Sequence, residues 1–110
     1  MKIIDIDSIK PPGGEVANFQ GAEHGANVSF FVVHFSHGQG PKRHRHPHEE
    51  TFVILEGEIE LVIDGARHRV GGGKITVIPA GTWHVFTVQS KEPVHMINIH
   101  PVPKMITEWA

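Results

Sequence analysis

The stretch Gly38-Gln-Gly-Pro-Lys-Arg-His-Arg-His-Pro-His-Glu-Glu-Thr-Phe-Val-Ile-Leu-Glu-Gly57 decides the fold of this chain. It brings His44, His46 and Glu50 into seven consecutive positions and then becomes apolar. His44 and His46 are two residues apart, so on an extended strand both side chains point to one face. Pro47 has no N–H to donate and interrupts that strand before Glu50 opens the next one. Imidazoles and carboxylates bind borderline divalent metals, so this stretch predicts part of a metal site.

A second stretch, Gly73-Lys-Ile-Thr-Val-Ile-Pro-Ala-Gly-Thr-Trp-His84, supplies a further histidine directly after a Pro-Ala-Gly turn. Together the two stretches resemble the two motifs of the cupin family. The residues that carry the first motif are Gly38, His44, His46, Glu50 and Gly57, and those of the second are Gly73, Pro79, Gly81 and His84. Val88 stands where the second motif usually ends in Asn. The short linker, 58–72, is similar to that of small single-domain bacterial cupins.

The resemblance implies a metal centre at the mouth of a β-barrel, with one divalent ion bound by His44, His46, Glu50 and His84. Three imidazoles and one carboxylate leave one or two coordination positions open for substrate or water, as in catalytic rather than closed structural sites. The donor set does not select among Mn, Fe, Ni and Zn. Glu50 is also the candidate catalytic base, because it could leave the metal and accept a proton.

The composition bounds the remaining choices. The 110 residues form one domain, 1–110, by the usual size of domains. The net charge of -2 gives no electrostatic reason to expect nucleic acid or an anionic membrane as partner. There is no cysteine, and no apolar run approaches the roughly 20 residues that span a bilayer. Carboxylates near the N-terminus interrupt any signal-peptide core, so a cytoplasmic protein is expected.

The order of apolar runs and turn signals predicts an all-β fold. About eight short strands follow one another at intervals of roughly ten residues, which is typical of a sandwich or barrel. Residues 2–9 are predicted as an edge strand, residues 18–27 as a loop with some extended character, and Asp64-Gly65 as a hairpin turn. Residues 105–110 are predicted as a helical turn or as an arm packed on a partner. The resemblance specifies the fold further as the cupin jelly roll, or double-stranded β-helix.

Side-chain parity gives a candidate pocket. Phe52 and Phe86 share parity with Glu50 and His84, so they should face the metal and make the pocket apolar. His34 and His95 either line this pocket or are hydrogen-bonded core residues. His48 is a further candidate for the pocket and is expected beside the ligands or at the surface rather than on the metal.

Other residues near the motifs receive simpler interpretations. His24, His37, His68 and His100 are interpreted as loop or surface residues. Trp83 either caps the cavity or packs at a subunit interface.

Two functions are compatible with these residues. The first is a metal-dependent enzyme, of dioxygenase, isomerase or lyase type, acting on a small polar carbonyl, enediol or sugar-derived compound, with His48 or His34 relaying protons. The second is a non-catalytic module that binds or senses a small ligand through the same metal. The absence of Tyr and Cys argues against the metal-free sugar epimerases and the thiol dioxygenases of the family. Apolar outer strand faces predict a homodimer.

Overall fold

The computed structural model describes all of residues 1–110 as ten strands and two short 3-10 helices. The elements in chain order are η1 Ile6–Ile9, β1 Val16–Phe19, η2 Gly21–Glu23, β2 Ser29–Phe35, β3 His44–Arg45, β4 Glu50–Glu56, β5 Glu58–Ile63, β6 Ala66–Gly71, β7 Lys74–Ile78, β8 His84–Val88, β9 Val94–His100 and β10 Glu108–Trp109. Neither helix is long and apolar enough to cross a membrane.

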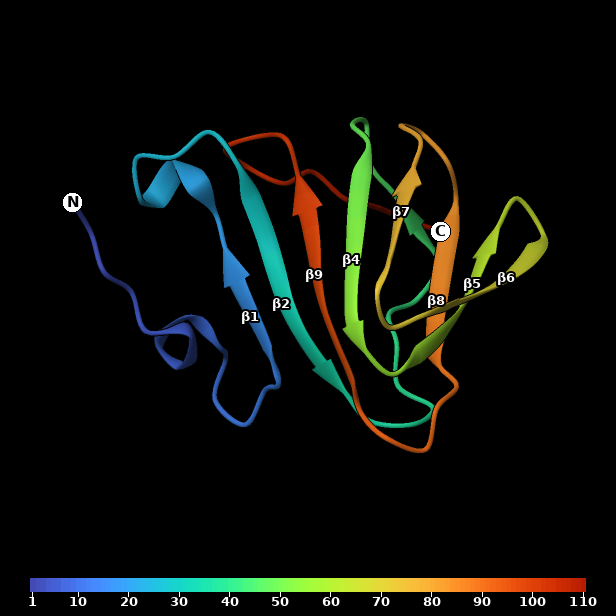
Figure 1. The fold of residues 1–110 in the computed structure, drawn as a ribbon. Coiled ribbons are helices and arrows are strands. Elements are labelled where there is room, and N and C mark those ends of the chain that lie inside the picture. The colour runs from blue at the N-terminus through green and yellow to red at the C-terminus, as the bar shows by residue number, and fades with distance from the viewer.

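The strands form two antiparallel sheets with five strands each (Figure 1). One sheet has the order β1-β2-β9-β4-β7, and the other has the order β10-β3-β8-β5-β6. From β3 onward the chain passes repeatedly between the two sheets, so neighbours such as β4 and β9 are distant in sequence. This is the jelly-roll arrangement that the sequence predicted, although the hydrogen-bonded ladders stay two separate sheets and do not close into one barrel.

The hydrophobic core lies between the two sheets, because every second residue of each long strand points inward. Strand β9 shows this most clearly, since its buried and half-buried residues alternate along all seven positions. The ten core residues are Val33, Phe52, Ile54, Ile59, Leu61, Ile78, Phe86, Val88, Val94 and Met96. Phe52 and Phe86, from opposite sheets, meet edge to face with ring centroids 5.4 Å apart.

Two turns have the backbone conformations that their residues favour. Asp64 and Gly65 both have positive φ, 48° and 80°, and they join β5 to β6 as the predicted hairpin. Gly57, with φ 84°, carries the chain from β4 in one sheet to β5 in the other. The β4–β9 ladder is irregular between Ile54 and Glu56, just before this glycine.

Two local predictions, for residues 2–9 and for the C-terminal tail, were wrong, and the prediction for residues 18–27 was confirmed in part. Residues 2–9 form no strand, because the Asp5 carbonyl accepts a hydrogen bond from the Ser8 N–H in the turn that η1 continues. Residues 18–27 have the predicted extended character at 18 and 19, which complete β1 and pair with β2, and the rest of the segment contains the 3-10 helix η2. The C-terminal tail is neither a helical turn nor an arm on a partner. Its strand β10 pairs with β3, and Glu108 accepts two hydrogen bonds from Arg45, at 2.8 and 3.0 Å.

Candidate metal centre

The sheet topology brings the four motif side chains together between the sheets. His44 on β3 and His84 on β8 are direct cross-strand partners, with ring centroids 4.3 Å apart. His46 follows two residues after His44 on the same side, and Glu50 begins β4 in the opposite sheet. All four residues are buried, and one ligand atom from each lies within 4.8 Å of the others.

Two of the imidazoles are oriented by the backbone just before them. His44 Nδ1 lies 2.7 Å from the carbonyl oxygen of Lys42, and His84 Nδ1 lies 2.9 Å from that of Thr82. A carbonyl can only accept, so each Nδ1 carries the proton and each Nε2 keeps a free lone pair. A histidine whose Nδ1 donates to a fixed acceptor in this way typically binds a metal through Nε2.

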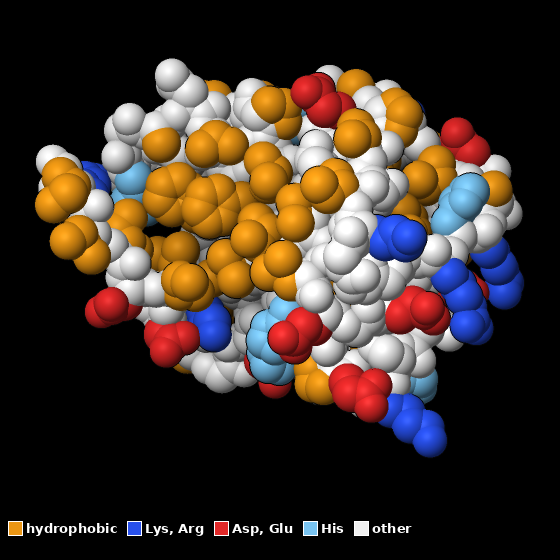
Figure 2. Space-filling model, viewed as in Figure 1, with side chains coloured by type: hydrophobic (Ala, Val, Ile, Leu, Met, Phe, Trp, Pro, Cys, Tyr) orange, Lys and Arg blue, Asp and Glu red, His pale blue; other side chains and the backbone are white.

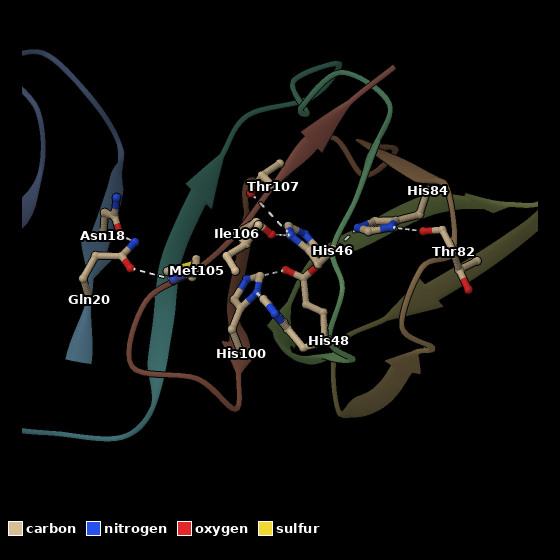
Figure 3. Close-up of polar contacts among 11 residues, drawn as sticks. Asn18, Gln20, His46, His48, Thr82, His84, His100, Met105, Ile106 and Thr107 are labelled. Carbon is tan, nitrogen blue, oxygen red and sulfur yellow. Dashed lines mark hydrogen bonds and ion pairs between the residues drawn. The ribbon is translucent and has the colours of Figure 1, made fainter. Parts of the chain in front are cut away.

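The C-terminal tail orients the third imidazole. His46 Nδ1 donates to the carbonyl of Ile106 at 2.8 Å, and the Thr107 hydroxyl lies 3.3 Å from the same nitrogen (Figure 3). Pairing of β10 with β3 fixes this tail segment against the site. The predicted ligand His46 is therefore positioned by a segment 60 residues further along the chain.

The imidazole Nε2 atoms and Oε1 of Glu50, which point into the site, have no donor groups facing their lone pairs. Glu50 Oε1 lies 3.2 Å from His46 Nε2 and 3.1 Å from His84 Nε2. The buried Nε2 of His46 makes no well-aligned hydrogen bond. With the Nδ1 atoms protonated, lone pairs of imidazoles and carboxylate converge on one another, which is unfavourable unless a cation lies between them. These residues fit a divalent metal.

Burial and mutual contact shift the acidities in the site. Burial acts to raise the pKa of Glu50, but contacts with His100, His46 and His84 outweigh it and hold that pKa well below its usual value. Burial and the neighbouring imidazoles lower the pKa of His44. Burial acts to lower the pKa of His46, but its contacts with Glu50 and with the Ile106 carbonyl outweigh burial and raise that pKa. Glu50 is therefore ionised and His44 neutral at pH 7, as metal ligands require, whereas a metal ion must displace the proton that these contacts favour on His46.

His100 is a buried neighbour of the site that the sequence interpretation missed. It is fully buried, so its assignment to a loop or surface was wrong. His100 Nε2 lies 3.0 Å from Glu50 Oε2, the oxygen that faces away from His46 and His84, although the contact is bent away from ideal hydrogen-bond geometry. Its Nδ1 lies 2.9 Å from Nε2 of the half-buried His48 (Figure 3). The alternation along β9 could have predicted its burial, because His100 lies at one of the alternate positions that are buried in this strand.

A cavity of about 190 Å³ lies against three of the four motif residues, His44, His46 and Glu50. Phe52 and Phe86 line it, together with Phe31 and Phe35, so its walls are largely aromatic. Asn98 also lines it, and the buried side-chain oxygen of Asn98 has no hydrogen-bond partner. The sequence interpretation did not single out Asn98. A single unpaired polar group in an apolar cavity can orient a ligand.

The other pocket candidates lie elsewhere. His34 and His95 are cross-strand partners with ring centroids 4.1 Å apart. They alternate with inward residues such as Val33, so they lie on the outer face of their sheet and do not reach the cavity. His48 does not line the cavity either, because it turns toward His100.

Trp83 neither caps the cavity nor lines it. The guanidinium groups of Arg43 and Arg45 lie over its ring, at 4.9 and 4.4 Å from the centroid.

Comparison with protein families places most of this chain in one domain type. The cupin domain profile matches residues 31–100, which include both motifs. Quercetin 2,3-dioxygenase of Bacillus subtilis is 33% identical over 81 residues, covering 71% of this chain and 24% of that protein. An uncharacterized protein of Aquifex aeolicus is 29% identical over 75 residues, covering 68% of this chain and 61% of that protein. The chain therefore spans a quarter to three-fifths of the length of these relatives.

Solved structures share the fold at low sequence identity. A conserved double-stranded β-helix protein of Klebsiella pneumoniae superposes with a TM-score of 0.78 at 22% identity, covering 99% of this chain and 91% of that one. Oxalate decarboxylase of Lactobacillus farciminis gives a TM-score of 0.76 at 19% identity, covering 86% of this chain and 30% of that one. At these identities the likeness concerns the fold alone.

Proposed function

Because this chain belongs to the cupin domain family, we propose that it is a metal-dependent enzyme acting on a small polar molecule. The ligands that we assign to one divalent ion are His44, His46, Glu50 and His84. The observation that carries the proposal is the convergence of buried imidazole Nε2 atoms on the Glu50 carboxylate, that of His46 without a hydrogen-bond partner, while the three Nδ1 atoms are held by backbone carbonyls.

The donor set indicates which chemistry is available. Three imidazoles and one carboxylate suit Mn, Fe, Ni or Zn and leave one or two positions open. A divalent ion held there polarises a carbonyl or acidifies a hydroxyl or water, and a redox-active ion adds dioxygen chemistry. This range is consistent with oxygenation, isomerisation or lyase reactions.

The surrounding side chains divide the remaining tasks. Glu50 would bind through Oε1 and is our candidate base, with Oε2 as the proton acceptor, since this oxygen faces away from His46 and His84 and toward His100. Asn98 orients the substrate through its unpaired side-chain oxygen or the amide nitrogen beside it. Phe52 and Phe86 exclude water, which strengthens electrostatic interactions within the cavity.

The cavity limits the size of the substrate. Its volume of about 190 Å³ is below the roughly 300–1,000 Å³ of pockets that hold drug-sized ligands. We therefore favour a compact carbonyl, enediol or sugar-derived acid over a polycyclic compound such as the flavonol on which the B. subtilis relative acts by name.

A second candidate function is a binding module that holds a small ligand on the metal without turning it over. The composition of the cavity supports it. Apart from the assigned ligands His44, His46 and Glu50, no residue that lines the cavity is titratable, so no separate acid–base pair is present. General acid–base catalysis would then depend on Glu50 alone.

A substrate panel distinguishes the two functions. Protein loaded separately with Mn²⁺, Fe²⁺, Ni²⁺ or Zn²⁺ is incubated in air with diketones, sugar acids, dicarboxylic acids and flavonols, and products are followed by mass spectrometry. We expect turnover with a compact substrate and its loss in Glu50→Gln. Tight binding without any product would favour the binding module, and turnover unchanged in Glu50→Gln would contradict the role given to this residue.

A further inference from the structure

The metal cavity continues into a second hollow on the inward side of β1. This hollow has a volume of about 590 Å³ and shares Val16 and Phe31 with the cavity, so the two spaces meet along these side chains. Asn18 and Gln20 line it from the side of β1, and residues 8–11 line it from the N-terminal segment. We call this hollow the β1 groove.

The second half of β1 is polar on its inward side and apolar on its outward side, which is the reverse of a strand that covers a core. Asn18 points inward with its ladder partner Phe31, whereas Ala17 and Phe19 point outward. Figure 2 shows the outward side of this sheet, where hydrophobic side chains form one continuous area over β1, β2, β9 and β4. The inward polar group of β1 therefore belongs to the β1 groove and not to the core.

The strand register places Asn18 in line with residues of the metal cavity. Asn98, which lines the cavity, is the ladder partner of Phe31, and Phe31 is in turn the partner of Asn18. Partners in adjacent strands lie about 4.8 Å apart, so about 10 Å separates the two asparagines, with Phe31 between them. This row leads from the metal cavity across an aromatic side chain to a second amide in the β1 groove.

The amide of Asn18 is held in place although this residue is exposed. Gln20 Nε2 donates to Asn18 Oδ1 at 2.9 Å, and Gln20 Oε1 accepts a hydrogen bond from the Met105 N–H at 2.9 Å (Figure 3). Asn18 Oδ1 is therefore occupied, while both N–H donors of Nδ2 are free for a ligand. Exposure to solvent alone would leave this side chain free to rotate, whereas a preorganised amide lowers the entropic cost of binding.

We propose that the β1 groove binds the hydroxylated chain of a sugar acid whose carboxylate end lies at the metal. This inference rests on the metal centre of the proposed function and names the part of the ligand that lies outside the cavity. An anionic group gains little in the groove, because Lys10 is already paired with Asp7 at 2.9 Å and Glu23 is itself negative. Hydroxyl groups both donate and accept, so they match the ammonium, the carboxylate and the free amide donors, while Phe31 packs against the carbon chain.

The spacing of the two amides sets the length of this chain. Of the roughly 10 Å between Asn98 and Asn18, two hydrogen bonds of about 2.9 Å each take up about 6 Å. The remaining distance of about 4 Å corresponds to about three C–C bonds, and so to about four carbon atoms. The carboxylate carbon and its neighbour at the metal bring the total to about six. The cavity then holds the compact reacting end of the molecule, and the β1 groove holds the rest.

The test measures the binding of hydroxy acids to the Zn²⁺-loaded protein by titration calorimetry. Glycolate carries only the end that reaches the metal, gluconate and galactonate add the hydroxylated chain, and 2-hydroxyhexanoate has a chain of equal length without further hydroxyls. We expect the better of the two sugar acids to bind about tenfold more tightly than glycolate or 2-hydroxyhexanoate. Asn18→Ala should weaken its binding about three- to tenfold and leave glycolate unchanged. The matched control is Asn27→Ala, at an exposed position outside the β1 groove.

A second measurement needs no variant. In NMR spectra of the Zn²⁺-loaded protein, the side-chain amide signal of Asn18 should shift with gluconate or galactonate at saturation and stay in place with glycolate. Equal affinity for all four hydroxy acids, wild-type affinity of Asn18→Ala for the sugar acids, or an unmoved Asn18 signal would overturn the β1 groove, while bound zinc and glycolate would show that the metal centre stands. Failure of all four acids to bind would instead contradict the metal-dependent function, and the groove with it.

Discussion

Replacing His100 tests whether Glu50 must be held in place to bind metal. His100 is fully buried at the end of β9, and its Nε2 lies 3.0 Å from Glu50 Oε2. His100→Leu replaces the imidazole with an apolar side chain of similar size and so removes this contact. It also leaves Nε2 of His48 without its 2.9 Å partner. Glu50 can then rotate away from the imidazoles, so the cost should appear in metal affinity.

The expected size follows from two independent ranges. A hydrogen bond to a charged group contributes about 1.5–3 kcal/mol, and the bent geometry of this contact favours the lower end. Loss of a group that orients a metal ligand typically weakens metal binding about 10–100-fold, which equals roughly 1.4–2.8 kcal/mol. We therefore expect His100→Leu to raise the dissociation constant for Zn²⁺ or Mn²⁺ by about one to two orders of magnitude.

The assay is calorimetric metal titration of the metal-free protein, supported by the visible absorption of bound Co²⁺, which reports a change in ligand geometry. His100→Gln is the rescue variant, because the Gln amide nitrogen reaches about as far as His Nε2 and can still donate to the carboxylate. His68→Leu, at an exposed position of β6, is the control. Wild-type affinity and an unchanged Co²⁺ spectrum in His100→Leu, with normal circular dichroism, would refute the reasoning.

Three further predictions concern the site and the core. His84→Ala removes a metal ligand itself, so the affinity for the metal should fall by more than about 100-fold and little metal should remain bound after dialysis. Near-stoichiometric metal in the dialysed variant would exclude His84 as a ligand. Imidazoles bind metal only when neutral and have an ordinary pKa near 6.5, so metal occupancy should fall below about pH 6 as protons compete for the nitrogens. Burial lowers the pKa of His44, so this residue should be protonated at a lower pH than an exposed histidine. Full metal occupancy at pH 4 would contradict the proposed site. Phe52→Ala empties a 1% exposed core position and should lower the free energy of unfolding by about 3–5 kcal/mol in urea titrations, whereas a loss below about 1 kcal/mol would show that the cavity wall collapses around it.

Local sequence rules were sufficient to predict the strand boundaries and the shared faces of the residues near the motifs. Proline, glycine and the spacing of two around His44 and His46 fix which side chains share a face, and the Pro-Ala-Gly turn fixes where His84 begins β8. The all-β fold class could therefore be predicted from short segments, whereas the convergence of the four motif residues was implied by the resemblance of both motifs to those of cupins.

Residues whose environment depends on distant pairing could not be placed in this way. The sequence does not tell which strand lies beside β9, so the contact of His100 with Glu50 was invisible although the parity of β9 was regular. His34 was ambiguous for a different reason. Strand β2 is apolar on both faces, so alternation did not show which side points inward. Strand β1 forms through its ladder with β2, against weak local propensity.

Anomalous X-ray scattering at the zinc edge, from crystals grown with Zn²⁺, tests the central claim most directly. We expect one strong peak per chain, about 2.0–2.2 Å from Nε2 of His44, His46 and His84 and from an oxygen of Glu50. A peak at any other position, or none at saturating zinc, would show that these four residues do not form a metal centre.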